Sequence, residues 1–243
     1  MQATTLYNEN HRWVMFGRDP GKPEKIIDTN QFLITSGDQS ILLDPGGIEL
    51  FAPMLAATLK YVPIDNITHL FASHQDPDII SSLGLWDQVL PNAKLHCPWL
   101  WEGFVRHFGM NNIEYAPIRD QGETIRVGNI DLQLIPAHYL HSSGNFNVYD
   151  PVAKILFSGD IGAALEAPDA PFEVENFNDQ IDKMQLFHQR WMPSNRAKQD
   201  WIRRVRKLDI EIMAPQHGRI FRGENVGKFL DWFEALEVGV AVQ

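Results

Sequence analysis

Four apolar runs in this chain each end in a side chain that can bind a metal ion, and this recurrence limits the fold more than any other feature. The runs are Leu70–His74, Leu134–His138, Leu156–Asp160 and Ile212–His217. Short apolar runs bounded by polar residues are typical of buried strands. Because layered α/β proteins place their chemistry where strands end, we expect these ends to converge along one edge of the sheets.

The segment from Ser73 to Asp78 is the richest of these ends, with an imidazole at His74 and carboxylates at Asp76 and Asp78. Pro77 removes a backbone donor and disfavours helical geometry in the residue before it. The triplet is therefore predicted to be extended, with its three side chains on one side. Alternatively, Asp76 caps a helix that begins at Pro77, and both can hold because a capping carboxylate keeps one oxygen free.

Composition narrows the class of protein. The 243 residues carry a net charge of -10 and are 44% hydrophobic, which suits one large domain over 1–243. The acidic charge argues against nucleic-acid binding. Cys97 is the only cysteine, so we expect no disulfide, thiolate zinc site or iron–sulfur cluster. Without a leader or a membrane-length apolar stretch, we expect a soluble cytoplasmic protein that binds no membrane.

Strand and helix patterns alternate along the chain. Strands are expected at 12–16, 31–43 as a hairpin, 67–72, 94–97, 113–117, 123–127, 131–136, 147–149 and 154–158, and helices at 48–61, 79–90, 99–108, 178–192, 196–208 and 226–236. The strand-rich pattern restarts midway, so the domain is expected to have two strand-rich halves, at roughly 1–115 and 116–243. Ser194 or Asn195 is expected to cap the basic helix at 196–208. The basic side chains of this helix are interpreted as a solvent-exposed face or, alternatively, as a binding site for a small anion or a partner.

The strand ends resemble the metal site of the metallo-β-lactamase superfamily. Hydrolases of that superfamily carry an H-x-H-x-D-H motif and then a His, an Asp and a His, and the matching positions here are His74, Asp78, His141, Asp160 and His217. The resemblance implies an α/β (α+β) fold, the αββα sandwich. Two positions depart from the motif, since Asp76 replaces its second His and Ile79 its last.

A carboxylate at the second position resembles the flavodiiron oxygen and nitric oxide reductases. Trp191–Asn195 and Ala214–Gly218 resemble, more narrowly, oxygen-binding di-iron proteins without the flavodoxin module. That likeness implies two iron ions with a bridging oxo or hydroxo group, and no flavin in this chain. His74, Asp76 and His141 are assigned to one ion, Asp78 and His217 to the other, and Asp160 to both. No catalytic residue beyond the metal ligands and no other cofactor-binding residue is expected.

The donor set agrees with this likeness. Three imidazoles and three carboxylates form an oxygen-rich shell that suits iron or manganese better than zinc. Because Ile79 cannot bind a metal, the second ion should keep an open or water-filled position, as dioxygen or nitric oxide requires.

Other candidate residues are given supporting roles. His138 is interpreted as a core residue or as one that hydrogen-bonds to a metal ligand. Asp44 is interpreted as a turn residue or as one that supports a ligand in the same way. His69 is expected to be structural, and His188 to be structural rather than to overhang the site. His11, His96 and His107 have no motif context.

The sequence therefore predicts a non-haem di-iron protein that binds dioxygen. It would act either as an oxygen sensor with a signalling partner or as a reductase that reduces dioxygen with electrons from an external donor. The alternative is a metal-dependent hydrolase of a phosphodiester or thioester, in which the basic helix holds an anionic substrate. Because flavodiiron relatives are commonly dimers, the resemblance also implies a homodimer. The physiological ligand and the role of the basic helix stay open at this point.

Overall fold

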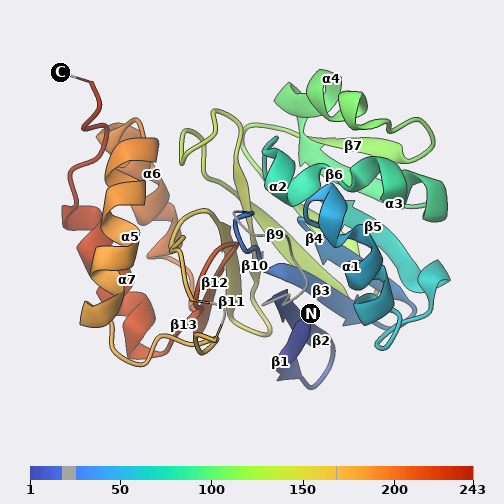
Figure 1. Ribbon diagram of the computed structural model, residues 1–243, viewed down its shortest axis with the longest axis horizontal. Helices are drawn as coiled ribbons and strands as arrows, with labels where there is room; N and C mark the ends of the chain where they lie inside the picture. The colour runs from blue at the N-terminus through green and yellow to red at the C-terminus, as the bar shows by residue number, and fades with distance from the viewer. Residues whose placement is uncertain (18–25, 168, 243) are drawn as a thin grey trace. The chain divides into compact units, whose positions relative to one another are not determined.

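The structure is a computed structural model that describes residues 1–17, 26–167 and 169–242. The chain divides into two compact units, Met1–Asp120 with Thr124–Asp131 and Gln121–Glu123 with Leu132–Gln243. Two sheets, of seven and six strands, run through the chain with helices between their strands (Figure 1). The predicted mixed α/β class is confirmed.

The seven-stranded sheet follows chain order from β1 to β7. Its strands are β1 (Gln2–Asn8), β2 (Arg12–Gly17), β3 (Gln31–Ser36), β4 (Gln39–Leu43), β5 (Ile67–Phe71), β6 (Lys94–Pro98) and β7 (Glu114–Ile118). The pairs from β1 to β4 are antiparallel, and those from β4 to β7 are parallel. The parallel strands need crossover connections, which the helices of this unit supply.

Those helices are short and often broken. They are α1 (Phe51–Thr58), α2 (Pro77–Ile80), α3 (Leu83–Val89) and α4 (Glu102–Val105), with 3₁₀ turns at Ile48–Leu50, Ile64–Asn66, Trp99–Trp101 and Arg106–Phe108. The single helices predicted at 48–61, 79–90 and 99–108 were thus too long. One break falls at Ser82, the residue before α3, whose hydroxyl donates a hydrogen bond to the Gly46 carbonyl at 2.7 Å.

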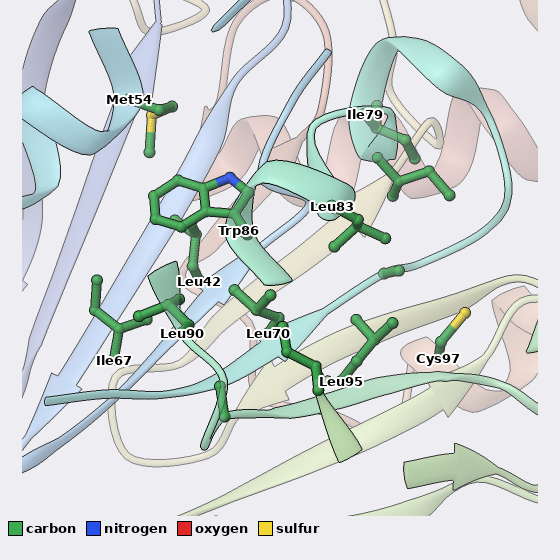
Figure 2. Close-up of a cluster of buried hydrophobic side chains, with 14 of the residues drawn as sticks. Leu42, Met54, Ile67, Leu70, Ile79, Leu83, Trp86, Leu90, Leu95 and Cys97 are labelled. Carbon is green, nitrogen blue, oxygen red and sulfur yellow. The ribbon is translucent and has the colours of Figure 1, made fainter. Parts of the chain in front are cut away.

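A compact apolar core anchors the strand that leads to the site. Figure 2 shows the Trp86 indole of α3 among side chains that include Met54, Leu42 and Leu70. All four side chains are fully buried. Burying one such side chain stabilises the folded state by about 1.5–3 kcal/mol. The position of β5, and of the loop that follows it, is therefore fixed by packing.

The six-stranded sheet has the order β13-β12-β11-β10-β9-β8. Its strands are β8 (Glu123–Val127), β9 (Ile130–Pro136), β10 (Phe146–Asp150), β11 (Ile155–Gly159), β12 (Ile212–Pro215) and β13 (Phe221–Arg222). β11 and β12 are parallel neighbours. The residues that follow these two strands therefore emerge at the same end of the sheet.

Three longer helices belong to the second unit: α5 (Asn178–Trp191), α6 (Asn195–Val205) and α7 (Glu224–Ala235), all drawn in orange to red in Figure 1. The predicted cap is confirmed, since the Ser194 hydroxyl accepts a hydrogen bond from the Ala197 N–H at 3.2 Å. Phe233 of α7 packs against His188 of α5 and Trp201 of α6, with ring centroids 5.2 and 5.9 Å apart. These contacts hold the three helices together.

Candidate metal centre

His74 follows β5 and is held by a hydrogen-bond chain behind its ring. The Asp44 carboxylate accepts hydrogen bonds from the Ser73 hydroxyl at 2.6 Å and from the Ser73 N–H at 2.7 Å. The Ser73 hydroxyl lies 2.8 Å from His74 Nδ1. Since that hydroxyl gives its one proton to Asp44, it accepts from Nδ1–H of His74. The lone pair of His74 is then on Nε2, the atom left to bind a cation.

Asp76 lies beside His74, with 3.5 Å between its Oδ2 and His74 Nε2. The prediction of an extended triplet is wrong from Pro77 onward, because α2 begins there and places Asp78 in its first turn. Asp76 takes the N-cap position in extended geometry, but its side chain makes no capping hydrogen bond. Ile79 is fully buried in the apolar core of this unit.

In the second unit, Asp160 presents its two carboxylate oxygens to two different histidines. Its Oδ2 lies 2.6 Å from His141 Nε2, and its Oδ1 lies 3.1 Å from His217 Nε2. Asp160 follows β11, and His217 follows the parallel strand β12. All three side chains are at most 11% exposed, so the cluster is largely shielded from bulk water.

The loop that carries His141 is closed by its own backbone. The Ala137 N–H donates to the Asn145 carbonyl at 2.9 Å, and the Tyr139 N–H donates to the Ser142 carbonyl at 2.7 Å. Tyr139 has a φ of 62°, a left-handed conformation that costs energy for a residue with a side chain. His138 packs edge to face on Phe146 at 5.1 Å. The position of His141 therefore depends on residues 137 to 145.

His188 supports the Asp160 loop from α5, a role that the sequence did not reveal. Its Nε2 accepts a hydrogen bond from the Gly162 N–H at 3.0 Å, and its Nδ1 contacts the Met184 carbonyl at 2.8 Å. Complete burial lowers the pKa of His188 to about 4, so the ring is neutral. His188 thus lies on the buried side of α5 and supports the turn after Asp160.

An aromatic cover lies against the His141 ring. Phe187 and Trp191 of α5 contact this ring edge to face, with centroid distances of 5.9 and 5.3 Å. They stack on each other at 5.9 Å. Their i, i+4 spacing is the one sequence signal that could have placed both on one face of the helix.

Glu166 ties α5 to the loop after His217. Its buried carboxylate contacts Lys183 at 2.8 Å and the Arg219 guanidinium at 3.1 Å. Burial raises the pKa of Glu166, but hydrogen bonds from Lys183 and Gln180 outweigh it and hold this pKa below its ordinary value. Because it stays charged, Glu166 keeps the two cationic partners in place.

Comparisons with known proteins identify the family of this chain. A family model described as "ODP family beta lactamase" matches residues 27–218. Two solved structures share 34% identity with the chain. One is a peroxy diiron species of the chemotaxis sensor ODP, with a TM-score of 0.88 over 100% of this chain and 98% of that chain. The other is the apo state of the chemotaxis sensor ODP from T. denticola, with a TM-score of 0.87 over 99% and 97%.

More distant relatives share the fold. The rubredoxin oxygen:oxidoreductase from Desulfovibrio gigas has 18% identity and a TM-score of 0.82, over 96% of this chain and 61% of that chain. An uncharacterised protein of Methanocaldococcus jannaschii, MJ0732, is 23% identical over 207 residues, which are 84% of this chain. The chain spans about half the length of that curated relative, since 52% of it is covered.

The two mixed sheets and these neighbours define a protein of the metallo-β-lactamase fold, as the motifs predicted. More narrowly, the chain belongs to the ODP family, whose model covers most of its length. The expected resemblance to the flavodiiron-like branch is confirmed as well.

Proposed function

We propose that this chain binds two iron ions and dioxygen, and that it acts as an oxygen sensor. The observation that carries the proposal is the geometry of Asp160, whose two oxygens face two different histidines. A carboxylate so arranged suits a bridge between two cations. The two 34% identical neighbours, of which one is a peroxy diiron species of a chemotaxis sensor, support the same assignment.

The donor residues fit iron. The proposed ligands are His74, Asp76, His141, Asp78, His217 and Asp160, grouped as the resemblance implies. Carboxylates and neutral imidazoles suit iron, whereas zinc sites usually hold more nitrogen or sulfur ligands. The contact of Ser73 with Nδ1 leaves the lone pair of His74 on Nε2, the nitrogen that can bind a cation. Bound iron would supply the redox chemistry that oxygen binding needs.

Ile79 supports an open position at the second ion. Its side chain is fully buried in the apolar core, so no imidazole takes the place that the hydrolases fill. We propose that dioxygen enters there and that nitric oxide competes for the same place. From the flavodiiron resemblance, we also propose that the chain forms a homodimer and that it can take electrons from an external donor.

Anaerobic iron loading followed by oxygen titration tests the function. We expect about two iron ions per chain by metal analysis, because six ligands form two sites. Oxygen should then produce new visible absorbance. Uptake of zinc alone, with hydrolysis of a phosphodiester or thioester, would instead support a metallo-hydrolase.

A further inference from the structure

A groove in the second unit lies between α6 and the residues that lead to His141. It has a volume of about 390 Å³ and is lined by residues 136–139, by residue 194 and by residues 196, 197, 200, 201 and 203 of α6. Ala137, Tyr139 and Trp201 give it apolar walls. The Trp201 side chain is held in place, because its indole N–H donates to Asn147 Oδ1 at 2.7 Å.

The rim of this groove is basic although the chain as a whole is acidic. Arg196 and Arg203 both line it. Arg203 shares the single carboxylate of Asp200 with Arg204, at 2.9 and 2.8 Å. In the described part of the chain, Arg196 forms no ion pair or side-chain hydrogen bond and is exposed. The Asp200 carboxylate therefore neutralises only part of the positive charge of these arginines. The groove rim is locally positive although the net charge of the chain is -10.

The groove is directly connected to a proposed metal ligand. Tyr139 is 54% exposed and lies two residues before His141. The Leu140 N–H donates to the Ala137 carbonyl at 3.0 Å, and the Asn145 side chain donates to the Leu140 carbonyl. Because Tyr139 and His141 belong to this one hydrogen-bonded loop, a displacement of Tyr139 also displaces the backbone of His141. A molecule in the groove and an ion at His141 therefore act on the same backbone segment.

We propose that this groove binds an acidic segment of a partner protein, and that the loop from Ala137 to His141 couples the binding to the metal centre. Exposed arginines at the rim attract carboxylates, whereas the exposed Tyr139 ring accepts an apolar side chain. Arginine, tyrosine and tryptophan are the residues that contribute most to protein interfaces. The coupling half of this inference rests on the proposed function, and the docking half does not.

Fluorescence anisotropy tests the docking half with the full chain. The probe is a labelled short peptide of aspartate and glutamate with one phenylalanine, and its lysine counterpart is the peptide control. We expect only the acidic peptide to bind, and its affinity should fall with added salt because exposed charges are screened. In the Arg196→Glu/Arg203→Glu double variant we expect Kd to rise about tenfold or more.

Arg204→Glu is the matched control, since Arg204 lies on the same helix and shares Asp200 but does not line the groove. It should change Kd by less than about threefold. Tyr139→Asn tests the apolar wall with a residue that tolerates left-handed backbone, and it should weaken binding in a chain that melts normally. Equal loss in Arg204→Glu, tighter binding of a single-stranded oligonucleotide, or self-association that Arg196→Glu abolishes would overturn the acidic-partner proposal.

The coupling half is tested on iron-loaded protein. We expect the peptide Kd to differ about fivefold or more before and after oxygen is admitted, and Tyr139→Asn to remove that difference. An unchanged Kd in a chain that binds iron and oxygen normally would overturn the coupling while leaving the proposed function intact. Peptide binding by a chain that takes up no iron would overturn the proposed function and leave the docking site standing.

Discussion

The Ser73 hydroxyl determines which nitrogen of His74, a proposed ligand, carries the proton. It is fully buried, and its proton goes to Asp44 while its lone pair faces His74 Nδ1. In Ser73→Ala, nothing fixes the proton on Nδ1, so the other tautomer becomes accessible. We expect iron affinity to fall about 10–100-fold, measured by competition with a coloured chelator.

Ser81→Ala is the control for Ser73→Ala. The Ser81 hydroxyl also makes one hydrogen bond in the same unit, from the Ile48 N–H at 2.9 Å, but it supports no proposed ligand. Iron affinity should be unchanged in this variant. Equal affinity in the two variants would show that Ser73 does not orient His74.

At the residue scale, the sequence predicted candidate ligands but not the residues that support them. Asp160 and His217 were predicted because each ends an apolar run. His188 was assigned a structural role without its partner, because its contact with Gly162 joins residues 26 positions apart. Such long-range contacts leave no local pattern, so only the folded chain shows them.

At the scale of elements, strands were predicted better than helices. The apolar runs of β5, β11 and β12 were recognised, whereas β1 was missed because its sequence is largely polar and its side chains are mostly exposed. The helix expected at 79–90 is divided before α3. At Gly84, an added Cβ would lie 1.9 Å from the Phe108 carbonyl oxygen, and a contact so distant in sequence has no local signal.

A histidine pair across β5 and β6 makes stability depend on pH. His69 Nδ1 lies 3.0 Å from His96 Nε2, and the rings stack at 5.2 Å. Burial, and then the neighbouring His69 and Lys94, lower the pKa of His96 to about 4. Burial and Lys94 also lower the pKa of His69. Both rings are therefore neutral in the folded protein at pH 7.

Acid should destabilise the metal-free protein through this pair. The unfolded chain binds protons at His96 below pH about 6.5, while the folded chain resists them until about 4. The stabilising contribution is complete above pH about 6.5 and is lost as pH falls toward 4, by at most about 3 kcal/mol. His96→Gln should reduce this loss in urea denaturation at several pH values. His107→Gln, at an exposed position, should leave it unchanged.

At the scale of the whole molecule, the chain consists of two compact units. No helix in the described ranges is both long enough and apolar enough to cross a membrane. Three proposed ligands come from the first unit and three from the second. Iron binding should therefore stabilise both units, since a ligand that binds only the folded state shifts the unfolding equilibrium of every element it needs.

Hydrogen exchange with and without iron tests this linkage. At free iron about 1,000 times its Kd, we expect about 4 kcal/mol of stabilisation and slower exchange in segments 73–80 and 158–162 alike. Asp160→Ala should abolish protection in both segments, because the shared carboxylate is lost and the two cations then repel each other. Asp182→Ala, at an exposed position on α5, should keep the full effect. Protection confined to one segment would mean that iron takes its ligands from one unit alone, and the proposed division of ligands would be wrong.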